Sequence, residues 1–426
     1  MQLNRKEAPK VELSSVFSFL KAESEVLNNG VPFHFINYSE QEILRLQLVF
    51  EAGTIFQKQN LVSSTVCNLI TEGTKKRSSK EIAELIENKG VFIETECTAE
   101  NACVSIYCLV SQLESVLPIL IEIIEEASFH EKEIQDYLNI RVQNFNVNSQ
   151  KVGFLTRNEF TSFIFGKDHP YSSKVVDSDF GNIKRDQLLS FFQEFYKKGE
   201  LEIYAAGKVN HKVKQLINNY LGSLVRTYSK AELPSFAAVP NDRKELYINK
   251  EDAVQTSIRI GKQTILKSHS DFPALYLVNV ILGGYFGSRL MANLREDKGY
   301  TYGVQSGLIN YRNVAYFVIS TEVGYKVAQD AVSQIEIEFN KMVSTTVSAE
   351  ELKLVKNYML GSVRRSFDGA FAAMDRFKSI RTLGLGYDYY TNLIDKIAAV
   401  DANELQATAE KYLQFETMRT ILAGKL

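Results

Sequence analysis

The sequence predicts an α+β protein made of two homologous halves, each a mainly antiparallel sheet with helices packed on it. The first observation is that the strand and helix patterns of residues 30–146 recur in the same order and with similar spacing after residue 245. The second is a polar stretch that contains Pro234 and Pro240 and separates the two series. The third is the length of 426 residues, which is enough for two units that each bury a core. We assign the N-terminal half to residues 1–228, a linker to 229–242 and the C-terminal half to 243–426.

The first half begins with a weak apolar alternation that predicts an ordered lead-in before residue 20. Ser78 with Glu81, and Ser111 with Glu114, have the spacing of capping boxes, so a helix is expected to start at each. After Ser111, apolar residues recur at steps of three and four, which indicates an amphipathic helix. The expected strands are 33–37, 44–51, 91–98, 102–109 and 201–206, and further helices are expected at 62–70, 81–89, 131–146 and 211–221.

The second half repeats this series. Strands are predicted at 245–249, 254–260, 301–310 and 314–322. Helices are predicted at 272–282, in the mixed segment after it, from residue 326 and after Ser348, which forms a third capping box with Glu351.

Composition excludes several classes of protein. An apolar content of 45% and a charged content of 23% are ordinary for a soluble globular chain. The formal net charge of −2 gives no electrostatic footprint for nucleic acid or an anionic membrane. The first ten residues carry charges of both signs and do not resemble a secretory signal. Cys67, Cys97, Cys103 and Cys108 show no CxxC spacing, so reduced thiols and a cytoplasmic location are expected.

The segment 283–302 contains the residues that best suit peptide chemistry. A glycine pair ends an apolar helix, a mixed helix follows, and a glycine turn leads into the predicted strand at 301–310. Arg295 is expected at the end of the mixed helix and Tyr302 on the strand, where both could be directed into one cleft. A guanidinium and a phenol can hold a peptide backbone or a developing oxyanion. The alternative is an arginine paired with Glu296 or Asp297 and a tyrosine in a half-buried strand.

This segment resembles the second-half signature of the pitrilysin/insulinase zinc peptidases. Their pattern Leu-Arg-Glu-x-x-Gly-x-x-Tyr is matched in full by residues 294–302. The resemblance extends to the duplicated α+β plan and implies two halves that face each other around a peptide-binding chamber. It also implies that Arg295 and Tyr302 bind the substrate backbone and help to stabilise the tetrahedral intermediate.

The first half does not carry the metal site that the resemblance implies. Family members bind zinc through His-x-x-Glu-His on a helix, whose glutamate acts as the general base. The two histidine positions fall on Ser64 and Asn68, and the base falls on Cys67. The third ligand, a glutamate on the long helix, falls near Gln143 or Asn144. The five histidines are His34, His130, His169, His211 and His269, and no two of them lie within one helical turn.

A second departure concerns the strand that holds substrate in the family. An Asn-Ala pair lies there on an edge strand to which the peptide adds as a further strand. The matching positions in this chain are near Glu94 and Thr95.

Three hypotheses for function follow. The first is a zinc-less subunit that supplies Arg295 and Tyr302 to a homologous partner, so that zinc is bound by the partner only and no cofactor is expected here. The second is a structural or peptide-binding homologue without a peptidase role. The third is a self-sufficient enzyme that uses Cys67 as a nucleophile or an unrecognised metal site.

Overall fold

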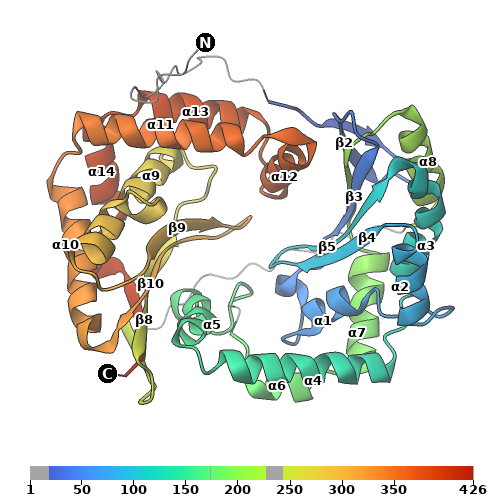
Figure 1. Cartoon of the computed structure of the whole chain (residues 1–426), viewed down its shortest axis with the longest axis horizontal. Helices are drawn as coiled ribbons and strands as arrows, with labels where there is room; N and C mark the ends of the chain where they lie inside the picture. The colour runs from blue at the N-terminus through green and yellow to red at the C-terminus, as the bar shows by residue number, and fades with distance from the viewer. Residues whose placement is uncertain (1–18, 173, 227–242, 426) are drawn as a thin grey trace, which may run out of the picture.

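The computed structural model describes residues 19–172, 174–226 and 243–425. The part of the predicted lead-in before residue 19 and the predicted linker at 229–242 lie outside the described residues. Figure 1 shows two groups of strands and helices that face each other across the middle of the molecule. The described strands that precede the predicted linker form one sheet, and those that follow it form the other.

The first sheet has six strands within the described residues, in the order β1-β2-β6-β3-β5-β4. β2 and β6 run parallel, and the other neighbouring strands are antiparallel. β3 is buried along almost its whole length because both faces of the sheet are covered. The strands are β1 Glu23–Val26, β2 Pro32–Asn37, β3 Ile43–Phe50, β4 Phe92–Cys97, β5 Ala102–Leu109 and β6 Leu201–Gly207.

The second sheet repeats this topology in the order β7-β11-β8-β10-β9. β7 and β11 are parallel, like β2 and β6, and the remaining pairs are antiparallel. Each of β7 to β11 therefore corresponds to one of β2 to β6 in place and direction, which confirms the predicted duplicated α+β fold. The strands are β7 Glu245–Asn249, β8 Gln255–Thr264, β9 Val304–Asn310, β10 Ala315–Gly324 and β11 Arg419–Gly424.

Helices cover both sheets. Those before the predicted linker are α1 Val62–Leu69, α2 Ser79–Glu87, α3 Leu113–Glu126, α4 Glu131–Asn148, α5 Val152–Phe165, α6 Asp177–Gly181, α7 Arg185–Phe191, the π-helix η3 Phe192–Lys197 and α8 His211–Leu221. Those after it are α9 Phe272–Asn279, the π-helices η4 Val280–Gly284 and η5 Met291–Asp297, α10 Ala328–Ser344, α11 Ala349–Arg365, α12 Gly369–Thr382, α13 Asp388–Ala399 and α14 Ala402–Tyr412. None of the described helices has the length and apolarity needed to cross a membrane.

Each sheet turns its apolar face to helices of its own half. In the first half Leu46 and Phe50 of β3 belong to one core with residues of α1, α3 and α8. In the second half Ile258 and Ile260 of β8 belong to a core with residues of α9, α10 and α14. The alternation along β10, where every second residue is buried, shows the same arrangement.

The other face of each sheet is covered by a helix from the opposite half. α5 precedes the predicted linker, yet it packs on β8 and β11 of the second sheet. α12 follows the linker and packs on β2 and β6 of the first sheet (Figure 1). Two smaller apolar clusters form at these crossings, one joining Phe160 to Ile421 and one joining Tyr204 to Met374. The two halves are therefore interlocked by an exchange of helices.

Of the three helix N-caps predicted from the sequence, two are confirmed and one is wrong. Ser78 and Glu81 form the predicted capping box of α2, and the Ser348 side chain accepts a hydrogen bond from the Glu351 amide at the start of α11. The box predicted at Ser111 is wrong, because Ser111 lies inside the 3₁₀ turn η2 (Val110–Gln112) that runs directly into α3. A residue whose backbone is already helical cannot act as an N-cap.

A buried histidine in β2 predicts how stability depends on pH. His34 lies against Ser24, whose hydroxyl is 2.7 Å from Nδ1, and burial lowers the pKa of His34 to about 4. The neutral imidazole therefore contributes its full stability above about pH 6.5, the unfolded pKa, and that stability is lost as the pH falls toward 4. We expect urea unfolding to show a loss on the order of 3 kcal/mol over this range. The profile should be flatter in His34→Gln, and an unchanged profile would contradict this assignment.

Candidate functional site

The helix α1 carries Ser64, Cys67 and Asn68, the positions to which the resemblance assigns the zinc motif. Its polar side chains bond to the local backbone: the Ser64 hydroxyl donates to the Leu61 carbonyl at 3.1 Å, and the Asn68 amide donates to the Ser64 carbonyl at 2.6 Å. Gln143, one of the two positions near the expected third ligand, is exposed on α4. A hydroxyl and two amides do not supply the imidazole, thiolate or carboxylate donors that zinc takes. The residues present at the motif positions therefore do not fit a zinc ion.

No group of three or more histidine, cysteine, aspartate or glutamate side chains placed to hold a metal occurs within residues 19–172, 174–226 and 243–425.

Cys67, at the position that the resemblance assigns to the general base, is fully buried. A hydrogen bond with the Cys97 thiol, together with burial, raises the pKa of the Cys67 thiol far above its usual range. Cys97, at the end of β4, is partly exposed and lies 3.2 Å from the Ser63 hydroxyl. Since a thiolate is the nucleophilic form of cysteine, Cys67 is poorly suited to covalent catalysis.

This environment predicts the order in which the two thiols react. In the native protein at pH 7–8, iodoacetamide should label Cys97 and leave Cys67 unmodified until the chain unfolds, because Cys67 is buried and protonated. Mass spectrometry of the digested protein gives the modified fraction of each cysteine. A Cys97→Ser variant shows whether Cys67 stays unmodified when the neighbouring thiol is absent. Labelling of native Cys67 at the rate of a free thiol would support the cysteine-nucleophile hypothesis instead.

Arg295 lies near the end of η5, as the sequence predicts for the end of that helix. Its guanidinium is over the ring of Phe286, 4.6 Å from the ring centroid. Phe286 is itself 65% exposed, so this pair lies at the surface. Among the described residues Arg295 forms no ion pair with Glu296 or Asp297, which leaves its donors available to a ligand.

Tyr302 does not lie on a strand, and the prediction that β9 begins at residue 301 is wrong. The strand begins at Val304, and Tyr302 lies in the preceding loop with 93% of its surface exposed. The cause is local: the Thr301 hydroxyl donates to the Gly303 carbonyl at 2.9 Å and accepts from the Gly303 amide at 3.0 Å. Such side-chain bonds to nearby backbone compete with the ladder of a sheet.

Tyr302 lines a cleft of about 740 Å³ between α5 and the second sheet. Other residues of this cleft are Arg157 on α5, Arg259 on β8 and Glu322 on β10. Arg295 does not line this cleft, so the structure does not bring the two residues together in it. They belong to neighbouring segments on the two sides of Gly299, whose φ of +65° forms the turn between η5 and the loop.

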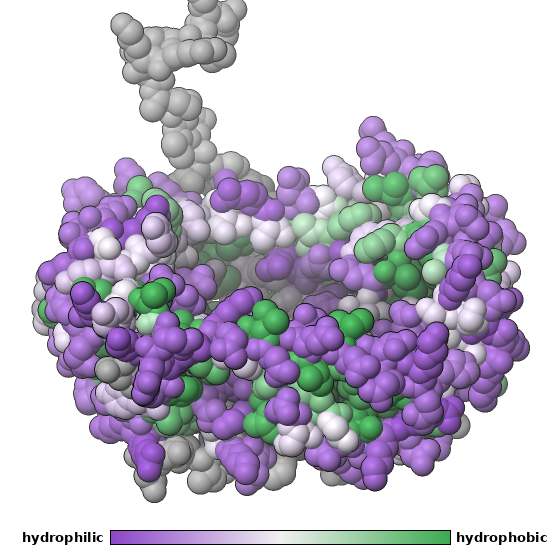
Figure 2. Space-filling model, turned by 60° about the horizontal axis from the view of Figure 1, so that its bottom comes forward, coloured by the Kyte–Doolittle hydropathy of each residue, from purple (hydrophilic) through white to green (hydrophobic). Residues whose placement is uncertain are grey.

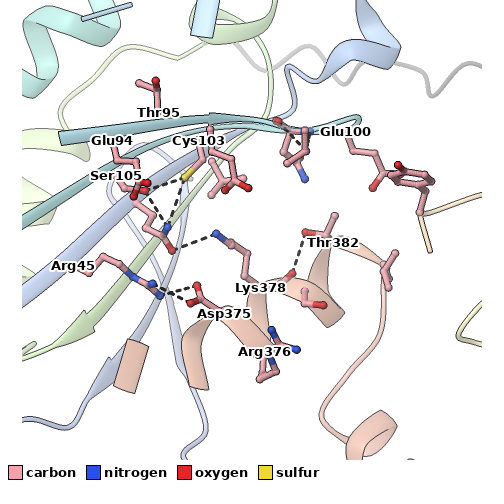
Figure 3. A pocket seen from close by; sticks show the side chains of 18 of the residues that line it. Arg45, Glu94, Thr95, Glu100, Cys103, Ser105, Asp375, Arg376, Lys378 and Thr382 are labelled. Atoms are coloured by element: carbon pink, nitrogen blue, oxygen red, sulfur yellow. Dashed lines mark hydrogen bonds and ion pairs between the residues drawn. The ribbon is translucent and has the colours of Figure 1, made fainter. Parts of the chain in front are cut away.

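A second cleft, of about 720 Å³, lies at the equivalent place in the first half, between the first sheet and α12. Arg45, Gln47 and Ser105 contribute to it from β3 and β5, while Asp375 and Lys378 contribute from α12. Figure 3 shows Arg45 directed at Asp375, with Nη1 3.0 Å and Nη2 2.8 Å from its two carboxylate oxygens. This bidentate pair fixes α12 to the first sheet.

The polar residues of both clefts lie on the sheet faces that turn away from the two main cores. Figure 2 shows the molecule hollowed near the centre of one face, with largely hydrophilic side chains in the hollow. β4 and β9 are the edge strands beside the two clefts, and Glu94 and Thr95 of β4 line the first cleft. An edge strand has unpaired backbone groups that can take up an extended peptide, with the cleft receiving its side chains.

The sequence did not point to the α12 residues Asp375, Arg376 and Lys378 as parts of a site. Their charges have the pattern of an ordinary solvated helix. They reach the first cleft only because α12 crosses to the opposite half, and no local signal in the sequence indicates that crossing.

Two family models match this chain. The model described as "Insulinase (Peptidase family M16)" matches residues 35–164, and the model described as "Peptidase M16 inactive domain" matches residues 182–359. Between them the two models span most of the chain. The second match begins at residue 182, just before α7, and so includes the last elements of the first half.

Curated relatives carry related descriptions. A Rickettsia felis protein described as an uncharacterized zinc protease is 23% identical over 405 residues, which cover 93% of this chain and 96% of the relative. A Helicobacter pylori protein described as the non-peptidase homolog YmxG is 22% identical over 411 residues and covers 92% of both chains. A Bacillus subtilis protein described as the probable inactive metalloprotease YmfF is 29% identical over 216 residues, 48% of each chain.

Solved structures share the fold. A Pseudomonas fluorescens protein described as a peptidase M16 inactive domain superposes with a TM-score of 0.84 at 22% identity, covering 96% of this chain and 99% of its own. A Helicobacter pylori protein described as a protease superposes with a TM-score of 0.83 at 15% identity, covering 96% of this chain and all of its own.

Proposed function

Because this chain belongs to the insulinase family of peptidases, M16, as a member without the zinc-binding residues, we propose that it works as the non-catalytic subunit of a metallopeptidase. The partner is a homologous chain with an intact His-x-x-Glu-His motif, which holds the zinc and activates the water. This chain binds the peptide backbone and presents Arg295 and Tyr302 to the reacting carbonyl.

The single observation that carries the proposal is the contrast between the two halves. The metal-motif positions hold side chains that zinc does not take, and two of them bond to their own helix. In the other half the whole Leu-Arg-Glu-x-x-Gly-x-x-Tyr pattern is present. Its arginine has no carboxylate partner among the described residues, and its tyrosine is 93% exposed. Side chains kept at the surface in this way are available to a substrate or a partner.

The experiment is a reconstitution with three preparations: this chain, the partner from the same organism, and their equimolar mixture. Each is given a quenched fluorescent peptide set of mixed sequence. We expect no hydrolysis by this chain, little or none by the partner, and turnover in the mixture that is lost when a chelator removes the metal. Hydrolysis by the partner at the full rate of the mixture would contradict the proposal.

One observation favours a second function, a peptide-binding homologue without a peptidase role. Arg295 is over Phe286 and does not line the cleft that contains Tyr302, so the two residues form no common site within this single chain. In that case a labelled peptide would bind this chain, but no homologous partner would gain activity from it. The same three preparations separate the two functions.

A further inference from the structure

A small pocket of about 220 Å³ lies beside the first cleft, among helices of the second half. Two basic residues, Lys267 and Arg376, line both the pocket and the cleft, so the two spaces adjoin. Lys267 lies in the turn after β8, where its amide donates to the Asn310 side chain at 2.8 Å. Arg376 lies on α12, and in Figure 3 no interaction joins its side chain to the other residues drawn.

The walls of this pocket are apolar and aromatic, with hydroxyl groups among them. They comprise Phe272, Tyr276, Leu308, Ser362, Val363, Ser366, Ser379, Tyr389, Tyr390 and Leu393. Some hydroxyls already have partners, since Tyr390 donates to the Arg376 carbonyl at 3.0 Å and Ser366 to the Val363 carbonyl at 2.7 Å. Among the described residues no hydrogen bond is formed by the side-chain hydroxyls of Ser362, Ser379, Tyr276 or Tyr389.

No acidic side chain among the described residues lines this pocket. Neither Lys267 nor Arg376 forms an ion pair within the described residues, and the nearby carboxylate of Asp375 is taken by Arg45. Burial and the positive charge of Arg376 lower the pKa of Lys267. A lowered lysine pKa is expected where two cations lie close together without a counter-ion. Cations in such an arrangement are stabilised when an anion binds between them.

From these contacts we infer that the pocket binds the C-terminal residue of a peptide, with the carboxylate between Lys267 and Arg376 and an apolar side chain against the aromatic wall. The volume of about 220 Å³ is that of a subsite for one residue and is below the range of a complete ligand pocket. The residues that precede the C-terminus then extend into the adjoining cleft of about 720 Å³, along β4. The inference deepens the proposed peptide-binding function and rests on it.

The test measures binding of N-terminally labelled octapeptides to the full chain by fluorescence anisotropy. One peptide ends in phenylalanine as the free acid, the second is its C-terminal amide, and the third is a free acid that ends in aspartate. We expect the phenylalanine acid to bind at least about tenfold more tightly than either of the others, because a charge-assisted contact and an apolar subsite are both satisfied. Unlabelled N-acetyl-phenylalanine should compete only weakly, since it lacks the residues that occupy the cleft.

Lys267→Gln and Arg376→Gln should each weaken binding of the phenylalanine acid by about tenfold and leave the affinity for the amide unchanged. Lys353→Gln is the matched control, because Lys353 is exposed on α11 and lines neither space. Thermal unfolding shows whether each variant is folded, and Lys267→Arg should restore affinity for the acid if its charge is what matters.

Equal affinity for acid and amide would overturn the inference while leaving the proposed peptide binding intact. Competition by N-acetyl-phenylalanine as strong as that of the whole peptide would also overturn it, since the pocket would then take small apolar acids. If no peptide binds, the inference fails, and the proposed subunit role is decided separately by turnover of the reconstituted complex.

Discussion

Replacing Arg295 by alanine is expected to lower the turnover of the reconstituted peptidase about a hundredfold, and Tyr302→Phe should have an effect of similar size. In the proposed complex each change removes a donor aimed at the charge that develops on the carbonyl oxygen, and loss of one such donor costs about 10²–10³ in kcat. The fall should be in kcat more than in KM, because the interaction strengthens in the transition state. Steady-state kinetics on one peptide, at saturating concentrations of the subunit, measure both constants.

Two controls separate this effect from general damage. Lys298→Ala removes an exposed cation three residues from Arg295, and Tyr247→Phe removes an exposed phenol on β7 that donates to Glu245 at 2.6 Å. Both should leave turnover unchanged. Zinc content and unfolding temperature should be the same in all variants, since Tyr302 is 93% exposed and buries almost no surface. Unchanged kinetics for Arg295→Ala and Tyr302→Phe would show that neither residue takes part in hydrolysis by the complex.

Replacing Phe160 by alanine is expected to cost about 3–5 kcal/mol of unfolding free energy, the usual range for a buried phenylalanine. Phe160 lies on α5, is 1% exposed, and packs on the opposite half: the Arg259 guanidinium is 5.6 Å and the Tyr316 ring 5.8 Å from its ring centroid. Because this contact joins the halves, its loss should also weaken their coupling. Calorimetry should show one transition for the unchanged chain and two for Phe160→Ala.

Phe339→Ala is the matched control for this prediction. Phe339 is equally buried but lies on α10 in the core of the second half, with residues of that half around it. Phe339→Ala should lower the unfolding free energy by a similar amount. Its calorimetric profile should differ, because the second half should unfold at a lower temperature. The same calorimetric profile for the two variants would show that the helix exchange does not couple the halves.

The duplicated fold could be predicted because each half encodes it by local patterns. The alternation of Leu44, Leu46 and Leu48 predicts a half-apolar strand, and these residues do face one core. Arg45 and Gln47, on the other face of the same strand, belong to the cleft, but only the crossing of α12 makes that face a site. No local pattern in the sequence indicates which of the two halves α12 packs on.

The candidate site could be predicted from the sequence only in part. The pattern at 294–302 placed Arg295 near the end of a helix, where it lies. The loop of Tyr302 was missed because strand propensity dominates the run after Gly299, whereas two bonds between Thr301 and Gly303 hold the backbone out of the ladder. Lys267 and Arg376 are 109 positions apart in the sequence, and only the packing of the turn after β8 beside α12 brings them to one pocket.

A duplicated fold of this kind can divide its chemistry between chains. When one half no longer carries ligands for a metal, the thiol of Cys67 and the amide of Asn68 can be absorbed into packing and local hydrogen bonds. In the proposed complex, the other half contributes to peptide hydrolysis only if a second chain brings a metal to it. The division of labour between the two subunits is therefore the claim on which the proposed function depends.

The most direct test is the metal content of the active complex, measured by mass spectrometry under native conditions and after its two chains are separated. We predict one zinc ion for each pair of chains, recovered entirely with the partner, and no loss of activity in Cys67→Ala. Zinc that stays with this chain after separation, or two zinc ions in each active pair, would contradict the proposal.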